Sequence, residues 1–125
     1  MEYNKNRGCS HKIYQVEKQK TKLSIINCYA PHMGLTMKDP LLGKKFYAEL
    51  VKTYKSFAGQ DVIITGDFNA KIGCKDFIGG PVGSFAHGTR NANGDLLFDF
   101  LAKHKLLAAN TFFKHKACQI TTWEG

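Results

Sequence analysis

Hydrophobic and polar positions in the first third of the chain predict a β-hairpin. Two runs rich in β-branched and aromatic residues, 11–16 and 23–29, are separated by the polar stretch EKQKTK. Such runs on either side of a short polar segment are typical of paired antiparallel strands. We expect Pro31 to end the second strand, because proline has no amide hydrogen to donate to a neighbouring strand.

Residues 41–57, LLGKKFYAELVKTYKSF, carry apolar side chains at a spacing of three to four. This spacing predicts an amphipathic helix that packs on a sheet through one apolar stripe. The stripe consists of Leu42, Phe46, Leu50, Tyr54 and Phe57, and the solvated surface carries Lys44, Lys45, Lys52 and Lys55.

Residues 62–65 form a continuous apolar and β-branched run between Asp61 and Gly66. Such a run suits a central strand that is covered on both faces. The following Gly-rich span, residues 70–94, has neither a helix nor a strand period, which predicts a long surface loop.

The C-terminal third predicts a second helix and two short strands. The helix runs from residue 95 to about residue 104, with Asp95 or Asn93 near its N-cap. Residues 106–110 and the QITTW stretch, 119–123, are expected to be strands. Strands interspersed with helices indicate an α/β or α+β layered domain.

Composition narrows the class of protein. A chain of 125 residues holds at most one domain. It has 18 Lys and Arg against 10 Asp and Glu, a formal charge of +8. This charge favours a polyanionic partner but equally describes many basic soluble proteins. The apolar runs are too short to span a bilayer, and residues 1–10 are too polar for a secretory signal, so an intracellular location is expected.

The four cysteines, Cys9, Cys28, Cys74 and Cys118, are scattered and contain no C-x-x-C pair, so free thiols are expected. His115 lies three residues before Cys118, and His104 is near in sequence. No spacing supplies a fourth ligand, so we predict no zinc site there.

Asp67 follows the apolar run directly, and an unpaired buried carboxylate costs several kcal/mol. Open α/β sheets place their chemistry at strand ends, where Gly66 lets the chain turn and lets a ligand approach the backbone. The residues alone leave an alternative open, because Gly, Asp and Asn are also ordinary turn residues.

Several motifs in order carry a family resemblance. ITGDFNAKIG resembles the G-D-x-N motif of the endonuclease/exonuclease/phosphatase superfamily, whose fold is DNase I-like, and IINCYAP resembles the tyrosine-bearing strand that precedes it. The order resembles the apurinic-endonuclease-like domain of non-LTR (LINE-type) retrotransposons and of derived host proteins of the craniofacial-development-protein-2-like group. The NANG turn, the NTFF stretch and TTW continue the resemblance, which covers about residues 23–123; several motifs in order are more specific than one.

The resemblance implies a four-layer α/β/β/α sandwich and the nicking of DNA by phosphodiester hydrolysis that depends on Mg²⁺ or Mn²⁺. DNA is the implied partner, and the nucleus is a location that such a partner would imply. In full-length relatives of this kind a reverse transcriptase domain accompanies the nuclease. Hydrolysis of this kind needs an activated water, a divalent ion and donors for developing charge.

The resemblance assigns Asp67 as the base or water-orienting group and Asn69 as a hydrogen-bond donor to the scissile phosphate. Two residues apart on an extended chain, both side chains would share one side. Tyr29 would contact the phosphate through its phenol, although a strand tyrosine packed in a core is the alternative.

The remaining candidates are nucleic-acid contacts or supports. Asn93 is either a helix cap or a site residue. Arg90, like His87, either touches backbone phosphate or only water. Asn110 stands where the family has an N-T pair that supports the active-site loops, and Trp123 is either near the nucleic-acid-facing end or in the core.

Two family motifs have no counterpart in this sequence: an upstream metal-binding Glu and a C-terminal S-D-H. We therefore expect the central part of the domain, incomplete at both ends, with activity impaired or absent. Two alternatives stay open. One is a small-molecule phosphoesterase of the same superfamily, against which the basic charge argues, and the other is a catalytically inactive nucleic-acid-binding module.

Overall fold

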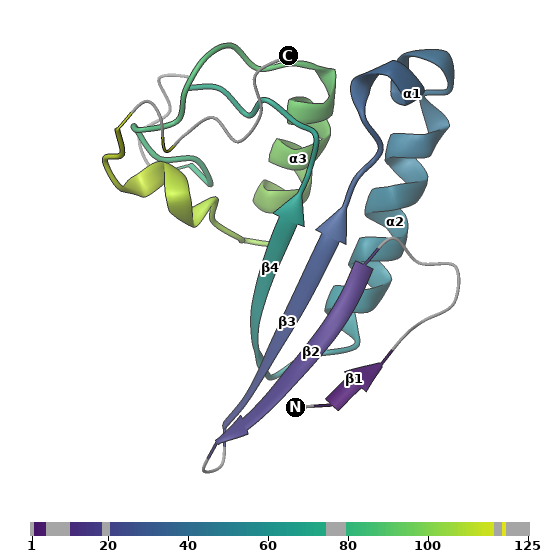
Figure 1. The fold of residues 1–125 in the computed structure, drawn as a ribbon, viewed down its shortest axis with the longest axis vertical. Coiled ribbons are helices and arrows are strands. Elements are labelled where there is room, and N and C mark those ends of the chain that lie inside the picture. The colour runs from purple at the N-terminus through teal and green to yellow at the C-terminus, as the bar shows by residue number, and fades with distance from the viewer. Residues whose placement is uncertain (1, 5–10, 19–20, 75–79, 117–118, 120–125) are drawn as a thin grey trace. The chain divides into compact units, whose positions relative to one another are not determined.

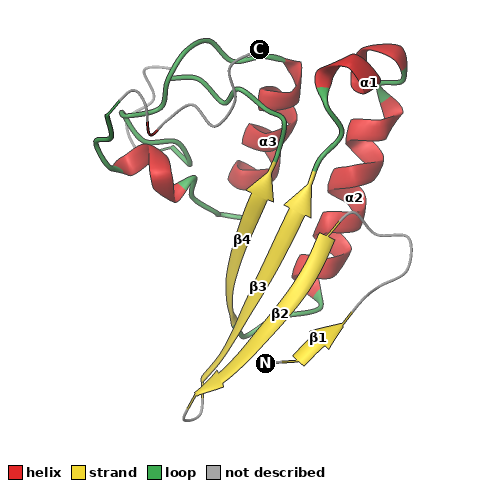
Figure 2. Cartoon of the chain, viewed as in Figure 1, coloured by secondary structure: helices red, strands yellow, loops and turns green. Residues whose placement is uncertain are grey.

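The computed structural model describes residues 2–4, 11–18, 21–74, 80–116 and 119. The chain divides into two compact units, Met1–Asn69 and Ala70–Gly125, each of which is described by itself. The first unit contains β1 (Glu2–Asn4), β2 (His11–Lys18), β3 (Thr21–Tyr29), α1 (Met33–Lys38), α2 (Leu41–Lys55) and β4 (Asp61–Asp67) (Figures 1 and 2). The second contains α3 (Ala92–Lys103) and the 3₁₀ helix η1 (Ala109–Phe112).

The strands of the first unit form one mixed sheet in the order β1-β2-β3-β4. Strand β2 pairs antiparallel with both β1 and β3, whereas β4 runs parallel to β3. The expected hairpin is confirmed as β2 and β3, which pair from His11 opposite Cys28 to Lys18 opposite Thr21. Strand β3 ends two residues before Pro31, as expected. The connection from β3 to β4 passes through α1 and α2, which supply the crossover that parallel strands require.

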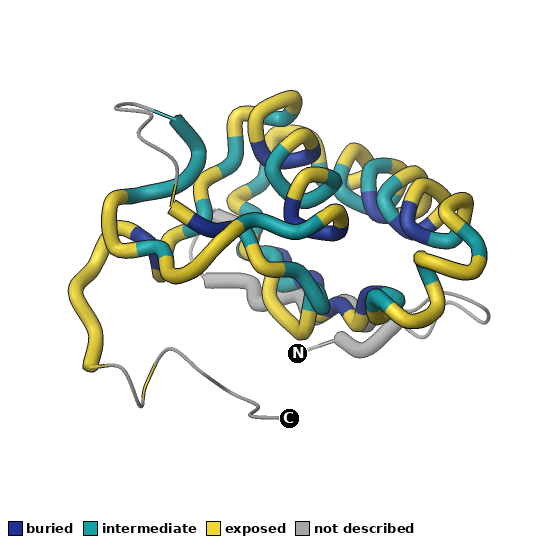
Figure 3. Tube along the Cα trace, turned by 90° about the horizontal axis from the view of Figure 1, so that it is seen from above, coloured by how far each residue is buried: buried dark blue, intermediate teal, exposed yellow. Residues whose placement is uncertain are grey.

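Helix α2 covers one face of this sheet, and the core of the first unit lies between them (Figure 3). Alternate residues of β3 point toward the helix, so Ser24, Ile26 and Cys28 are buried, as is Ala30 directly after the strand. From α2, Gly43, Phe46 and Leu50 are buried in return. The amphipathic helix expected from the sequence is therefore confirmed. In the connection between α2 and β4, Gln60 Oε1 accepts a hydrogen bond from the Ser24 hydroxyl at 2.8 Å. This bond satisfies the buried hydroxyl of Ser24.

One position of α2 was not assigned to its apolar stripe from the sequence. The ring of Tyr47 meets the ring of Phe46 edge to face, with centroids 5.0 Å apart. Burial raises the pKa of the Tyr47 phenol well above its ordinary value, and Cys28 adds a smaller effect in the same direction. Tyr47 thus joins the layer between α2 and β3.

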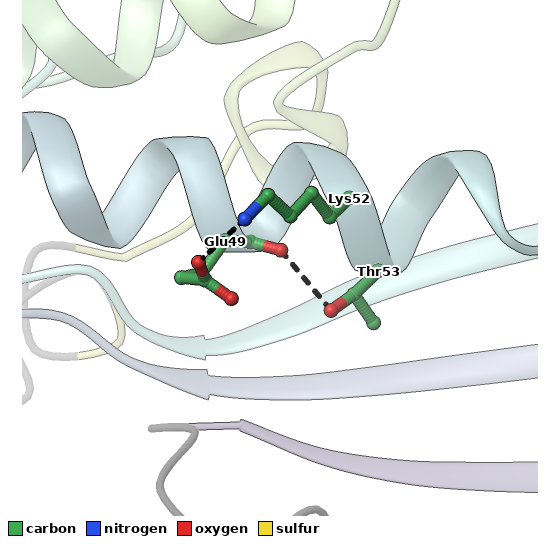
Figure 4. Close-up of polar contacts among 3 residues, drawn as sticks. All are labelled: Glu49, Lys52 and Thr53. Carbon is green, nitrogen blue, oxygen red and sulfur yellow. Dashed lines mark hydrogen bonds and ion pairs between the residues drawn. The ribbon is translucent and has the colours of Figure 1, made fainter.

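The outer surface of α2 is polar. Lys52 Nζ lies 3.0 Å from Glu49 Oε1, and the Thr53 hydroxyl donates to the Glu49 backbone oxygen at 3.1 Å (Figure 4). Both charged side chains are more than half exposed, so this pair contributes at most about 0.5 kcal/mol to stability. The lysines expected on the solvated face of this helix, Lys44, Lys45, Lys52 and Lys55, are all exposed.

The expectation that residues 62–65 form a strand covered on both faces is wrong. The strand itself is present, but β4 is an edge of the described sheet, and its residues are either exposed or half-buried. Ile63 is 52% exposed. The face that carries Ile63 is opposite to the one covered by α2, and an apolar run cannot by itself distinguish one covered face from two.

The second unit differs from the sequence expectations at both of its elements. Helix α3 starts at Ala92, three residues earlier than expected, and its N-cap is Asn91 instead of Asp95 or Asn93. The segment 106–110 is not a strand. It makes one isolated bridge, Ala108 to Val82, and then enters η1. Residues 120–123 of the expected QITTW strand lie outside the described residues.

The long span before α3 has no regular secondary structure where it is described, as expected for a loop, but it is held by specific bonds. The Arg90 Nε donates to the Ile72 backbone oxygen at 2.8 Å, and Cys74 N donates to the Gly88 oxygen at 3.3 Å. Gly73 and Gly88 both have positive φ, which lets the loop double back. Cys28 and Cys74 are free thiols, and Cys9 and Cys118 lie outside the described residues.

The fold class is therefore mixed α/β, as the element pattern predicted. The first unit shows a helical layer on one face of a mixed sheet, so the four-layer sandwich stays a prediction. Within the described part of the chain, no helix is both long and apolar enough to cross a membrane.

Candidate active site

Tyr29 and Asp67 are neighbours at the carboxyl ends of the two parallel strands. They are register partners in the β3–β4 ladder, so their side chains stand on the same face of the sheet. The same face carries the pairs Asn27 with Thr65 and Ile25 with Ile63, and it is opposite to the face covered by α2. Tyr29 is 62% exposed and Asp67 is exposed, so this Tyr29 is not the buried core aromatic that the sequence left as an alternative.

The chain after β4 is fastened to the end of β3. Ala30 N donates to the Asp67 backbone oxygen at 2.8 Å, which extends the ladder by one bond. The Asn69 side-chain Nδ2 then donates to the Ala30 backbone oxygen, also at 2.8 Å. These two bonds fix the exit of β4 relative to the exit of β3.

Asn69 also determines the orientation of the Asp67 carboxylate. The Asn69 backbone N–H donates to Asp67 Oδ1 at 2.8 Å, a side-chain-to-backbone turn that aspartate commonly makes. Asn69 itself has a φ of 46°, which a non-glycine residue adopts rarely and asparagine more readily than most. The expectation that the chain stays extended from Asp67 to Asn69 is therefore wrong. The two residues are joined by a tight turn that the bond from Asn69 N to Asp67 Oδ1 closes.

Gly66 has a role different from the one expected for it. Its φ is 128°, and a Cβ at this position would overlap the backbone oxygen of Cys28 and lie 2.6 Å from Cys28 N. The close approach that requires glycine is thus with β3. The glycine allows β4 to stay in register up to Asp67 while its backbone presses against the neighbouring strand.

The other candidates belong to the second unit. Arg90 is half-buried, and its guanidinium carbon lies 4.0 Å from the centroid of the Phe98 ring, a cation–π contact. Together with the bond from Arg90 Nε to Ile72, this contact holds the side chain within the loop. Asn93 is buried in the first turn of α3, Asn110 is exposed in η1, and His87 is exposed. Trp123 lies outside the described residues.

Asn91 is a structural residue that the sequence reasoning missed. Its Oδ1 accepts from Gly94 N at 2.8 Å and from Lys71 N at 3.1 Å, so one side chain caps α3 and ties the helix to the start of the loop. Asn91 N donates back to the Lys71 oxygen at 3.1 Å. The signal was present, because Asn91 stands three residues before Gly94, which is the N-cap to N3 spacing, but Asn93 offered a competing choice.

The described residues contain no group of three or more His, Cys, Asp or Glu side chains that could enclose a metal ion. Mg²⁺ does not require such a cage, because it retains several waters and uses one or two carboxylates. The carboxyl ends of β3 and β4 offer Asp67 for this purpose. Asp67 is exposed and its carboxylate is already oriented by Asn69, so it fits as a single oxygen ligand or as a group that binds a metal-held water.

Fold and site together define a mixed α/β domain whose polar residues gather where two parallel strands end. Comparison with curated proteins shows two relatives with the same description. The chain is 36% identical over 80 residues to craniofacial development protein 2 of Tragulus javanicus, and 31% identical over 102 residues to craniofacial development protein 2 of Bos taurus. These matches cover 63% and 81% of the chain but only 14% and 17% of the relatives, so the chain spans about a sixth of their length.

Both proteins are distant homologues of this chain, which agrees in part with the resemblance found in the sequence. No protein-family model matches the chain. No solved structure matches it either.

Proposed function

We propose that this chain contributes the phosphate-facing edge of a phosphodiesterase site that cuts DNA with the help of Mg²⁺ or Mn²⁺. The observation that carries the proposal is the pairing of Tyr29 with Asp67 at the carboxyl ends of β3 and β4. A phenol and a carboxylate that lie side by side on an exposed face can both contact one phosphate group from the same direction. Carboxyl ends of parallel strands are also where open α/β sheets place their ligands.

The assigned roles follow from the chemistry of each side chain. Asp67 is the group that accepts a proton from water or aims it at phosphorus, and its orientation is fixed in advance by the Asn69 N–H. Tyr29 donates its phenolic hydrogen to a phosphate oxygen. Asn69 is the amide that orients the phosphate, and the bond to Ala30 fixes the plane of that amide. Hydrogen-bond donors that are already in place need not reorient when negative charge develops on the phosphate in the transition state, so no reorganisation energy is lost.

A divalent ion would supply charge neutralisation for the phosphate and for the leaving oxygen. Asp67 is the residue of this edge that would hold the ion or its water. The net charge of +8 supports DNA over a small phosphoester, because a long polyanion can contact several cations of the surface at once. The resemblance to the endonuclease/exonuclease/phosphatase superfamily and the two homologues support the same assignment.

The experiment is a plasmid-nicking assay with the protein in its complete natural reading frame. We expect conversion of supercoiled to open-circular DNA in Mg²⁺, loss of nicking in EDTA, and a fall of at least about 100-fold in Asp67→Ala. The matched control is Asp61→Ala. Asp61 is an exposed aspartate on the same face of the same strand, about 20 Å away at its other end. Its removal should leave nicking unchanged.

Nicking that persists in Asp67→Ala would contradict the proposal. Binding of DNA without any cleavage that depends on Asp67 would instead support the alternative of a catalytically inactive nucleic-acid-binding module. A faster reaction with an inositol phosphate than with DNA would favour the small-molecule phosphoesterase.

A further inference from the structure

Three phenylalanines of the second unit are exposed to an extent that is unusual for this residue type. Phe85 is 45% exposed, Phe112 is 41% exposed and Phe113 is 65% exposed. Phe112 and Phe113 follow each other at the end of η1, the yellow-green turn in Figure 1. Large apolar side chains that gather at the surface indicate an interaction site more often than single ones do.

The backbone beneath these side chains is rigidly bonded. Phe85 N donates to the Thr111 backbone oxygen at 2.9 Å, which places Phe85 beside the turn that carries Phe112. The buried Thr111 hydroxyl accepts from Gly83 N at 2.7 Å and donates to the Ala108 oxygen at 2.6 Å. A Cβ on Gly83 would overlap the Thr111 oxygen, so the two segments meet backbone to backbone. Phe85 and Phe112 are therefore mounted on a preformed support, which lowers the entropic cost of binding, and Phe113 follows this support directly in an extended conformation.

Two lysines, Lys114 and Lys116, lie directly behind the aromatic pair in the sequence. Lys114, His115 and Lys116 come directly after Phe113, and all three are exposed. In the sequence, no aspartate or glutamate occurs between Asp99 and Glu124. This stretch therefore combines exposed rings with a local excess of cations, which is the composition that binds a polyanion carrying flat apolar groups.

We propose that Phe85, Phe112, Phe113, Lys114 and Lys116 form an aromatic-basic surface that binds an unpaired nucleic-acid strand. The rings stack on exposed bases while the two lysines contact the backbone phosphates. Duplex DNA keeps its base faces stacked on each other and cannot offer them to the phenylalanines, so this surface prefers single strands. The inference does not depend on the hydrolytic role of Asp67.

The first measurement is fluorescence anisotropy with a labelled oligothymidylate of about 12 nucleotides, a typical site size for such surfaces. Phe113→Ala should weaken binding about fivefold or more, which is the effect of losing one stacked base. Phe113 is mostly exposed, so its truncation should not disturb folding. The matched control is Met37→Ala, which shortens an apolar side chain that is 75% exposed on α1 of the other unit. The control should bind as the unaltered protein does.

The second measurement is the salt dependence of the same binding. Replacing Lys114 and Lys116 together by alanine should reduce the slope of log affinity against log salt by about 1.4, because each phosphate contact on a single strand contributes about 0.7. The control pair is Lys44→Ala with Lys45→Ala, two adjacent exposed lysines of α2. That pair should leave the slope nearly unchanged.

The proposal is overturned if Phe113→Ala binds oligothymidylate as well as the unaltered protein does, or if it loses duplex binding to the same extent. Self-association in sedimentation that disappears in Phe113→Ala, with oligothymidylate binding intact, would also overturn it and would make this surface a contact between copies. An oligouridylate of equal length tells whether the strand is DNA or RNA, and tighter binding of either supports the surface as proposed. Loss of nicking in Asp67→Ala leaves these measurements unaffected, so the two proposals fail separately.

Discussion

Asn69 reaches across 39 residues of sequence to donate a hydrogen bond from its side-chain amide to the backbone oxygen of Ala30 at 2.8 Å. The same residue holds the Asp67 carboxylate through its backbone N–H and adopts a φ of 46°. One residue thus joins the ends of β3 and β4 and orients the candidate catalytic group. The polar residues at this edge of the sheet are therefore held in place by specific hydrogen bonds of the fold.

Two substitutions of Asn69 distinguish the contribution of its backbone conformation to stability from that of its side-chain amide. Asn69→Ala should destabilise the protein by about 2 kcal/mol, because it loses the bond to Ala30 and places a Cβ without side-chain compensation at positive φ. Asn69→Gly should cost about 1 kcal/mol less, since glycine adopts this φ without strain. Urea unfolding measures both values. Equal losses for the two variants would show that the left-handed conformation carries no cost here.

Gly66 should tolerate no side chain. Gly66→Ala is expected to lower the free energy of unfolding by about 3 kcal/mol or more, because the new Cβ overlaps the Cys28 backbone and the φ of 128° is one that glycine alone adopts readily. The matched control is Gly59→Ala. Gly59 also has a positive φ, of 80°, but nothing lies within 4 Å of a Cβ there, so the cost should be about 1 kcal/mol. Thermal unfolding of the two variants tests the difference, and similar melting temperatures would contradict the close approach of β4 to β3.

Asn91 should contribute to stability through its side-chain oxygen. Asn91→Ala removes the acceptor for Gly94 N and Lys71 N and should cost about 1 to 2 kcal/mol. Asn91→Asp keeps an oxygen acceptor at the helix N-terminus and should cost much less. Amide hydrogen exchange at Gly94 and Lys71 provides the measurement. Unchanged protection of both amides in Asn91→Ala would show that other groups hold the cap.

Tyr47 makes stability depend on alkaline pH. Burial raises the pKa of its phenol above the unfolded value of about 10, so the folded protein retains a proton that the unfolded chain loses. The stabilising effect is complete below pH 10, and the free energy of unfolding falls as pH rises above 10, by at most about 1.4 kcal/mol per pH unit. Tyr47→Phe has no proton to lose there. Urea unfolding from pH 9 to 11.5 should show a shallower decline for Tyr47→Phe, and parallel curves would refute the assignment.

Features with a local cause could be predicted from the sequence. The polar stretch between two β-branched runs gave the hairpin, and the three-to-four spacing of Phe46 and Leu50 gave α2, because both patterns reflect neighbours along the chain. Asn91 and η1 were missed because they depend on residues that are distant in sequence. Whether Asn91 or Asn93 caps the helix depends on where Lys71 N lies, and whether residues 106–110 extend depends on the bonds that Thr111 makes to Gly83.

By itself the sequence determined which residues are apolar and which side chains are candidates for phosphate chemistry. Asp67, Asn69 and Tyr29 could be selected because the stretches that contain them, ITGDFNAKIG and IINCYAP, resemble motifs of a known family. Only the tertiary structure decided that β3 and β4 are parallel and in a register that pairs Tyr29 with Asp67. It also decided that β4 has one open face and that Gly66 is needed for contact with Cys28. Strand register and backbone proximity arise from residues that are distant in sequence, so no local pattern encodes them.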